Sequence, residues 1–490
     1  MIKRNLLFVL FLLGLLFRIV ISFQNYSGDV TNHMIWGETA VKHGLKGLYN
    51  IDFYKYYGHI SPNYPPITIL FFAFFYLVKI WVYQFAWFLN LHMSIFPSKL
   101  IFFLKDFNYY PRLLKLPAIL SDIGIAYITY LFAKKIIGKK KSAWPLIATS
   151  LVLFNPAYFY NSAYWGQTDS IPLFFLLVSF YILIYQKKFL TSAILFTLGL
   201  LSKQTIIIFT PFYLIVLFHL SNLSRHSERS EESSDPPAGG ERKLRFGMSN
   251  VPSLDFSVTS FLRNDSLRSF IIVSLVTFII FWLFFLPFYQ NGNPLLFPLI
   301  TYLNKIILVS GLPFTSNHAF NFWYLLTGSR TTLASSKFIL NISYEVWGLL
   351  ITGVISALIL LKAVRNNFHL KHILYTGFLI PLTSFLFLTK MHERHLILVL
   401  PFLLLAATPR HPDPAKGGRR ISFLLISYLF ISLFNFFNMY HDWWSPPLPF
   451  LQQVLSSSFV TKSSTQLLIG FFLILLINYF KENFLRGESK

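Results

Sequence analysis

The chain of 490 residues is hydrophobic at 54% of its positions and charged at only 12%, and it contains 56 phenylalanines. Soluble domains carry roughly 25% charged residues, and a soluble fold of this length has no interior large enough for so much apolar surface. The composition therefore excludes a soluble protein and predicts an all-α polytopic membrane protein. The absence of cysteine excludes disulfides, thiolate catalysis and cysteine-ligated metals.

Apolar runs long enough to cross a membrane recur along the chain, since a bilayer core of about 30 Å needs roughly 20 helical residues. We predict about twelve transmembrane helices. The stretch 189–219 supplies two short ones, which are interrupted at Ser202, Lys203 and Gln204. The other ten spans are expected near 5–23, 113–133, 143–160, 171–186, 269–289, 345–362, 372–390, 394–408, 421–438 and 466–480.

The segment 66–104 is apolar enough to span, but it contains Lys79 and Lys99 and follows a pair of prolines. It could form a further pair of spans, or helices that lie at the membrane surface. We favour surface or re-entrant helices within a large first exterior loop, 24–112.

The net charge of +23 is unevenly distributed, and 26 of the 42 Lys and Arg residues fall in the short pieces predicted to be cytoplasmic. Positive residues accumulate on the cytoplasmic side of membrane proteins. We therefore place both termini in the cytoplasm, in a cell-membrane protein, and interpret the charge as a topology signal. No nucleic-acid partner is expected.

Two polar segments divide the chain into membrane modules. The first, 221–268, is rich in Ser, Arg, Glu and Pro and is predicted to be a disordered cytoplasmic insert; a regulatory or partner-binding loop is the alternative. A shorter insert is expected at 409–420. The membrane modules are 1–220, 269–408 with an exterior loop at 290–344, and 421–490 with a basic tail.

Nine of the 19 acidic residues lie outside the predicted cytoplasmic pieces, and most of these are at exterior positions. Asp29 opens the first exterior loop within GDVTNHMIWGE (28–38). A carboxylate just outside the bilayer can accept a proton from an acceptor hydroxyl, whereas the alternative is a helix N-cap. Glu38 is a weaker candidate, because it could lie on a solvated helix face.

A second candidate cluster is NSAYWGQTDS (161–170), a short exterior loop between two spans. Trp165 offers a stacking face for a sugar, and Gln167 and Asp169 offer partners for hydroxyl groups, while Gly166 lets the backbone turn. The alternative is an interfacial aromatic belt with a polar turn.

Cationic groups form the remaining candidates. Lys203 and Gln204 separate two short spans, where an unpaired ammonium would be costly, so we expect either a substrate phosphate or a protein carboxylate beside Lys203. In KMHERH (390–395), Arg394 could hold a phosphate, with His392 and His395 beside it. These two histidines are three residues apart, unlike the zinc pattern HExxH, so no metal is expected.

These motifs together resemble a known pattern. GDVTNHMIWGE, NYPP (63–66), KLPAILSD (115–122), WGQTDS (165–170), SKQ (202–204), FNFW (320–323) and HERH (392–395) occur in this order. The order resembles bacterial relatives of GPI mannosyltransferase II, in the GT-C superfamily of polyprenyl-phosphate-sugar-dependent glycosyltransferases. It is also similar to the dolichyl-phosphate-glucose glucosyltransferases. The resemblance covers roughly 25–405.

The resemblance implies a site on the extracytoplasmic face, a lipid-phosphate sugar as donor, no nucleotide and no metal cofactor. It implies Asp29 as general base, Lys203 and Arg394 near the phosphate, and Trp165, Gln167 and Asp169 on the sugar or acceptor side. The expected function is transfer of a mannose- or glucose-type hexose to a glycan or glycolipid acceptor. The alternative is a transporter or flippase for a lipid-linked saccharide, which would place ionisable residues along a path through the bilayer.

Overall fold

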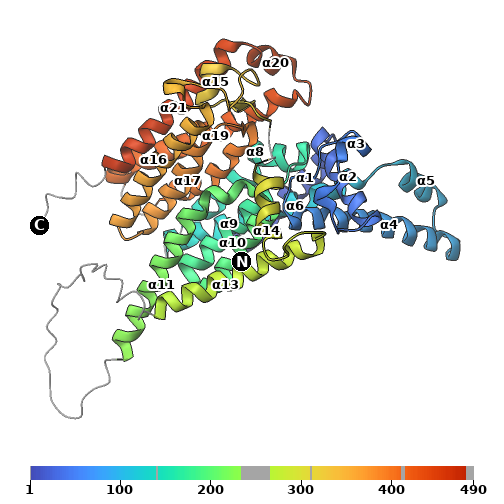
Figure 1. Ribbon diagram of the computed structural model, residues 1–490, viewed down its shortest axis with the longest axis horizontal. Helices are drawn as coiled ribbons and strands as arrows, with labels where there is room; N and C mark the ends of the chain where they lie inside the picture. The colour runs from blue at the N-terminus through green and yellow to red at the C-terminus, as the bar shows by residue number, and fades with distance from the viewer. Residues whose placement is uncertain (1, 139–141, 233–264, 309–311, 410–413, 482–490) are drawn as a thin grey trace, which may run out of the picture.

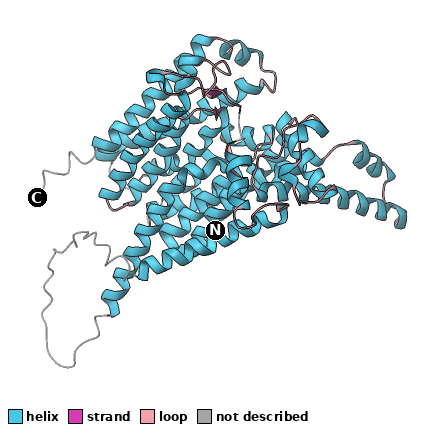
Figure 2. Ribbon diagram, viewed as in Figure 1, coloured by secondary structure: helices cyan, strands magenta, loops and turns pink. Residues whose placement is uncertain are grey.

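The computed structural model describes residues 2–138, 142–232, 265–308, 312–409 and 414–481, and in these ranges the chain is almost entirely helical (Figure 2). The single pair of strands in this part of the chain is parallel and joins β1 (Ser316–Asn317) to β2 (Met391–His392). The fold class is therefore all-α, as predicted. The α-helices are α1 (Ile2–Ser22), α2 (Gly28–Lys42), α3 (Phe53–Tyr57), α4 (Pro66–His92), α5 (Ser98–Asp106), α6 (Tyr110–Ile137), α7 (Trp144–Leu153), α8 (Pro156–Phe159), α9 (Ser170–Tyr181), α10 (Phe189–Ser202), α11 (Thr210–Glu232), α13 (Asp265–Phe285), α14 (Phe297–Thr301), α15 (Phe322–Thr327), α16 (Tyr344–Arg365), α17 (Leu370–Phe387), α18 (Leu400–Ala406), α19 (Pro414–Trp443), α20 (Pro449–Leu455) and α21 (Ser458–Lys481).

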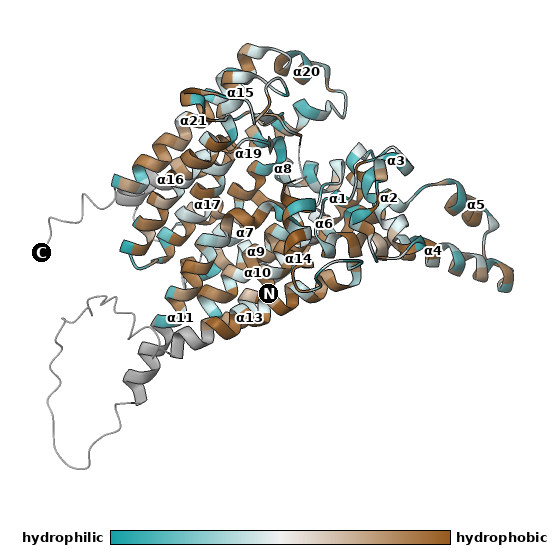
Figure 3. Cartoon of the chain, in the orientation of Figure 1, coloured by the Kyte–Doolittle hydropathy of each residue, from teal (hydrophilic) through white to brown (hydrophobic). Residues whose placement is uncertain are grey.

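Nine helical segments in the described residues are long and apolar enough to cross a membrane. Eight of them match predicted spans, and the ninth, Pro66–His92, lies in the segment for which surface helices were favoured. Two further predicted spans are shorter apolar helices, Ser170–Gln186 and Phe189–Ser202. Figure 3 shows hydrophobic residues along most of α13, α16 and α19, as expected for helices in contact with lipid.

The two predicted spans that remain, 143–160 and 394–408, are interrupted. In the first, α7 ends at Leu153 and α8 begins at Pro156, because proline lacks the N–H that a continuing helix needs. In the second, a 3₁₀ segment, Glu393–Val399, precedes the short helix α18. Both interruptions lie next to motifs singled out in the sequence.

The helices α4 and α5 project from the helical body in Figure 1 and run across the direction of α16 and α17. The far half of α4 and most of α5 expose large apolar side chains, including Trp81, Phe85, Phe88 and Phe102. A helix with this direction and exposure is suited to the membrane surface. The arrangement favours a position of α4 and α5 at the membrane surface, and this position stays a prediction.

The polar inserts are partly helical. Helix α11 continues to Glu232 and α13 begins at Asp265, so that helices enter the predicted insert 221–268 from both sides. Arg, Glu and Lys are good helix formers, so an apolar helix can extend into such a sequence. The middle of this insert, 233–264, lies outside the described residues. Helix α19 likewise begins at Pro414, within the predicted insert 409–420.

The buried apolar side chains form two clusters, and the site described below lies where they meet. The larger cluster contains residues of every helix from α6 through α11, packed together with residues of α17, α18, α19 and α21. The smaller one joins α2, α3 and α4 to the first turns of α6 and to the 285–306 region. The first cluster holds the helical bundle together, whereas the second fixes the segment 24–112, the predicted exterior loop, against it.

Buried polar contacts join α1, α6 and the WGQTDS segment at one end of the bundle. Arg18 on α1 pairs with Asp122 on α6 at 2.9 Å, with both side chains fully buried, and Ser162 and Ser170 donate hydrogen bonds to the same carboxylate. Lys115 donates to the carbonyl groups of four residues, which lie at the end of α1 and in the turn before WGQTDS: Ser22, Asn25, Ala163 and Tyr164. These contacts attach the loop that contains Asp29 to the WGQTDS segment.

Candidate active site

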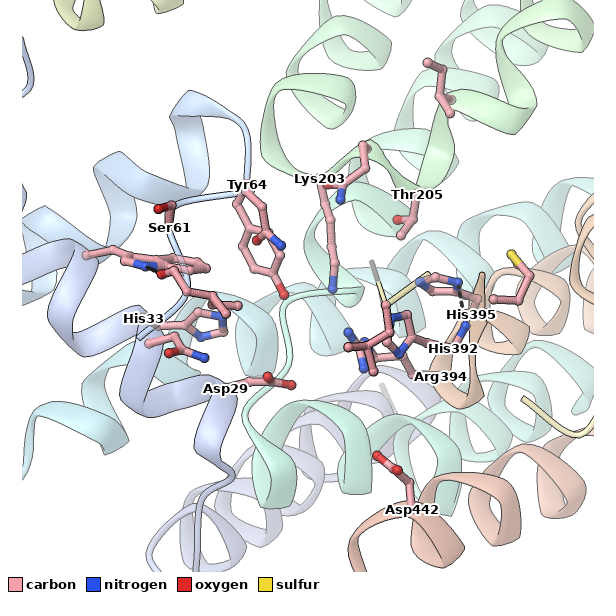
Figure 4. Close-up of a pocket in the computed structure, with 18 of the residues that line it drawn as sticks. Asp29, His33, Ser61, Tyr64, Lys203, Thr205, His392, Arg394, His395 and Asp442 are labelled. Carbon is pink, nitrogen blue, oxygen red and sulfur yellow. Dashed lines mark hydrogen bonds between the residues drawn. The ribbon is translucent and has the colours of Figure 1, made fainter. Parts of the chain in front are cut away.

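One cavity of about 700 Å³ collects most of the residues that the sequence singled out (Figure 4). Its walls come from α2 and the 54–64 loop, from the break between α10 and α11, and from the 391–398 segment. Arg330, Leu312 and Asp442 complete the lining. Six predicted site residues share this cavity although they come from distant parts of the chain: Asp29, Lys203, Gln204, which was predicted on the sugar or acceptor side, His392, Arg394 and His395.

Asp29 lies in the first turn of α2 and faces the cavity. The N-cap of α2 is Ser27, which makes no side-chain cap, so the alternative interpretation of Asp29 as an N-cap is wrong. The amide of Gln167 donates a hydrogen bond to Oδ2 of Asp29, and the Tyr64 hydroxyl donates to Gln167 Oε1 at 3.5 Å. Because an amide cannot take up the proton, these contacts orient the carboxylate and leave it available as a base.

The WGQTDS segment supports the site from behind. The chain turns at Gly166, with φ of 92°, after a π-helical turn at Tyr160–Trp165. The Trp165 carbonyl accepts a hydrogen bond from the Ser27 amide at 3.1 Å. The Trp165 ring is buried and stacks on Trp443, with ring centroids 5.8 Å apart. Trp165 therefore belongs to an aromatic cluster and does not line the cavity.

Gly166 has both a left-handed conformation and a close neighbour. A Cβ atom at this position would lie 2.5 Å from Cγ2 of Val30, the residue after Asp29. We expect Gly166→Ala to destabilise the protein by about 1–3 kcal/mol through strain and overpacking, measured as a lower unfolding temperature in detergent. Gly28→Ala is the control, because a Cβ there meets nothing within 4 Å; equal stability of the two variants would contradict this prediction.

Lys203 is the residue at which α10 ends, in extended conformation (φ −158°, ψ 141°). Its ammonium lies 2.8 Å from Oδ1 of Asp169, and both side chains are at most 2% exposed. The same ammonium lies 5.0 Å from the ring centre of Tyr64. The predicted carboxylate partner is therefore present. Since an ammonium has three N–H donors, the pairing leaves donors for a ligand in the cavity.

The HERH segment lies on the opposite wall, held by the pairing of β2 with β1. Nη1 of Arg394 lies 2.8 Å from the buried carboxylate of Glu393, and Nε of Arg394 lies 3.8 Å from Oδ2 of Asp169. His392 and His395 pack edge to face, with centroids 5.6 Å apart. Asp169 thus contacts the two cations, which come from distant parts of the chain.

The electrostatics of the site follow from these pairs. Burial by itself would raise the pKa of Asp169, but Lys203 and Arg394 outweigh it and lower that pKa. For Glu393, burial is likewise outweighed, by Arg394 and His392, and the pKa is lowered. Burial lowers the pKa of His33 to about 3, against the opposing charge of Asp29. The two acids are therefore anionic and His33 is neutral at neutral pH.

Not every predicted residue reaches the cavity. Gln167 and Asp169 are buried and act on lining residues, as described above, whereas Gln204 itself lines the cavity. Glu38 lies outside, where it pairs with Lys42 at 2.5 Å and accepts a hydrogen bond from Tyr76. In FNFW, Asn321 caps α15 and Trp323 donates to the Phe387 carbonyl, so this motif anchors the segment 290–344, the predicted exterior loop.

Several polar residues that line the cavity were not singled out in the sequence, among them His33, Tyr64 and Arg330, and Asp442 was only one of the nine acidic residues outside the predicted cytoplasmic pieces. His33 and Tyr64 lie inside the motifs GDVTNHMIWGE and NYPP, so the motifs contained the signal. Arg330 and Asp442 are brought to the cavity by the loop 290–344 and by the end of α19. Oδ1 of Asp442 lies 3.8 Å from Nη2 of Arg330 and 3.2 Å from Nε2 of His318.

In the described part of the chain, no group of three or more His, Cys, Asp or Glu side chains is placed to hold a metal ion. His392 and His395 are therefore without the third ligand that a catalytic metal normally has.

Comparison with known proteins adds one family. A sequence model of the DIE2/ALG10 family matches residues 112–293. The matched part includes KLPAILSD, WGQTDS and SKQ, but Asp29 and HERH lie outside it. No curated protein matches the chain. The match covers less than half of the chain and agrees with the resemblance to GT-C glycosyltransferases. The match does not confirm the resemblance to the relatives of GPI mannosyltransferase II in particular.

Proposed function

We propose that this protein transfers one hexose, of mannose or glucose type, from a polyprenyl-phosphate donor to a hydroxyl group of a glycan or glycolipid acceptor. The single observation that carries the proposal is the cavity in which Asp29 lies together with Lys203 and Arg394. A base and two cations in one cavity are what such a transfer requires, because a proton leaves the acceptor as a phosphate leaves the sugar.

In the proposed reaction, Asp29 accepts the proton of the acceptor hydroxyl while its oxygen attacks the anomeric carbon. The bond from this carbon to the phosphate oxygen breaks, and the polyprenyl phosphate departs with the electron pair. Gln167 supports this role by orienting the carboxylate through one of its oxygens. Positioned base catalysis of this kind contributes about 10²- to 10⁴-fold.

Lys203 and Arg394 are proposed to bind the donor phosphate, with His392 and His395 beside them. Asp169 contacts both cations and lies behind the cavity wall, so it holds the ammonium and the guanidinium in place. Fixed charges that need no rearrangement stabilise a leaving anion most effectively. No metal or other cofactor is part of the proposal.

The lining also offers a place for the lipid chain. Ile207, Ile208, Leu312 and Leu398 line the cavity, and both Ile207 and Leu312 are exposed. Ile207 and Ile208 follow Lys203 by one turn, so a polyprenyl chain could leave the cavity over them while its phosphate stays at Lys203. Gln204 is proposed to contact the sugar from the same wall. Trp165, Gln167, Asp169 and Glu38 do not line the cavity, so a direct sugar contact is not proposed for them.

We further propose that the cavity faces the extracytoplasmic side of the cell membrane and that both termini are cytoplasmic. The distribution of Lys and Arg in the loops supports this orientation. All the loops and helices that surround the cavity come from pieces that the charge distribution assigns to the exterior or to span ends.

The test is transfer of labelled sugar by the purified protein in lipid vesicles. We expect transfer from polyprenyl-phosphate glucose or mannose to added glycolipid, and none from nucleotide sugars. A chelator added to the same reaction should leave the rate unchanged. Movement of an intact lipid-linked saccharide between leaflets without any transfer would instead favour the flippase, and absence of transfer from every polyprenyl-phosphate sugar would overturn the proposal.

A further inference from the structure

The cavity contains a histidine that the proposed reaction leaves without a role. His33 lies one turn after Asp29 on α2 and lines the same cavity (Figure 4). Residues four apart on a helix lie on one face, with Cβ atoms roughly 5–6 Å apart. A group at this distance from the base is within reach of the same sugar ring.

The ring of His33 is held rigidly by aromatic neighbours. It stacks on Phe72, with centroids 4.4 Å apart and planes 18° apart, and it contacts Tyr64 and Trp36 at 5.2 and 5.5 Å. The side chain is only 1% exposed. A ring fixed on several sides holds each of its nitrogens in a defined direction, as a residue that selects a ligand must.

One ring nitrogen of His33 has no partner in the described part of the protein. Its Nδ1 is buried and has no hydrogen-bond partner among the described residues. A buried polar atom without a partner is costly, and such groups in native structures call for an explanation. A ligand that occupies the cavity supplies one, because a neutral imidazole offers both a donor and an acceptor.

The charges around His33 come from four segments. Asp29 shares its helix, Lys203 follows α10, Arg394 lies on the opposite wall, and Asp169 lies behind the cavity wall. The negative and positive groups oppose each other, and burial keeps the imidazole neutral. A neutral ring is suited to an uncharged hydroxyl group, whereas the phosphate is left to Lys203 and Arg394.

We propose that His33 is a specificity-determining residue whose imidazole hydrogen-bonds one hydroxyl group of the sugar bound beside Asp29. This inference rests on the proposed function. The sugar is either the hexose being transferred or the acceptor sugar, since both rings must approach Asp29 in the reaction.

The test compares two variants of one residue. His33→Phe keeps the stacking on Phe72 but removes both nitrogens, whereas His33→Gln keeps a donor and an acceptor. We expect His33→Phe to lower kcat/KM about tenfold, the usual size for one neutral hydrogen bond, and His33→Gln to recover part of this loss. His43→Phe is the matched control, because His43 lies at the far end of α2 and is exposed.

Deoxy sugars separate a hydrogen bond from a structural effect. In the wild-type protein, one monodeoxy analogue of the polyprenyl-phosphate sugar, or of an octyl glycoside acceptor, should lose about tenfold in kcat/KM through its missing bond to His33. In His33→Phe the same analogue should lose nothing further, because the bond is already absent. The analogue that shows this coupling identifies whether donor or acceptor contacts the ring.

A purely structural role of His33 would lower the amount of active protein without changing the order of the analogues. If His33→Phe is as active as the wild type, or if every deoxy penalty persists in it, the inference is overturned while the proposed function stands. If the wild-type protein transfers no sugar, the proposed function fails and the inference fails with it.

Discussion

Replacing Asp29 with asparagine should reduce sugar transfer by about 10²- to 10⁴-fold, the range for loss of a positioned base. Asparagine has nearly the shape of aspartate, and its carbonyl oxygen can still accept the hydrogen bond from Gln167. The variant should therefore fold normally and bind the donor with an unchanged KM. Initial rates with labelled polyprenyl-phosphate sugar in vesicles measure the effect.

The control for this variant is Asp106→Asn, which removes an exposed carboxylate at the end of α5. Its rate should equal that of the wild type. Equal unfolding temperatures of the two variants in detergent would exclude a difference in folding. An Asp29→Asn protein that transfers sugar at the wild-type rate would show that another group, such as Asp442 in the same cavity, is the base.

Replacing Lys203 with methionine should impair both stability and transfer, because Lys203 has two roles. Its loss leaves the buried carboxylate of Asp169 with only the more distant Arg394. Removal of one partner of a buried ion pair typically costs about 3–5 kcal/mol, and the remaining Arg394 puts the expected cost near the lower end. The unfolding temperature in detergent and the KM for the donor are the two measurements.

A double variant separates the two roles. Lys203→Met combined with Asp169→Asn removes both charges, so much of the lost stability should return. The KM for the polyprenyl-phosphate donor should stay high, because no ammonium is left to contact the phosphate. Lys42→Met is the control, since exposed pairs such as Lys42–Glu38 contribute little. If the double variant recovers both stability and KM, Lys203 is only a structural partner of Asp169.

Both predictions depend on Asp169 and Gln167, and here sequence and structure differ in an instructive way. The sequence identified the two residues as polar groups in a short exterior turn and assigned them to the sugar or acceptor. The structure places them behind the cavity wall, where they hold Lys203, Arg394 and Asp29. The residue types were informative, but whether a side chain faces a ligand or another side chain depends on packing.

Trp165 and Glu38 show the same limit. A tryptophan beside a glycine turn is equally suited to a sugar and to an aromatic cluster, and only the position of Trp443, far along the chain, decides between them. Glu38 is on the same helix as Asp29 and His33, but its side chain pairs with Lys42 away from the cavity. His33 was missed because the motif GDVTNHMIWGE does not show which of its polar side chains faces a cavity and which faces another side chain.

The sequence by itself determined the class of fold, because composition and the length of apolar runs depend only on local chemistry and on the thickness of a bilayer. It also determined the break at Lys203, where polar residues interrupt an apolar run. The tertiary structure alone decided which spans are interrupted, and that Asp29, Lys203 and Arg394 share one cavity. The net charge of +23 shows the same difference. The sequence explains most of the positive charge as a signal of orientation. Only the packing of distant segments shows that Lys203 and Arg394 meet at Asp169.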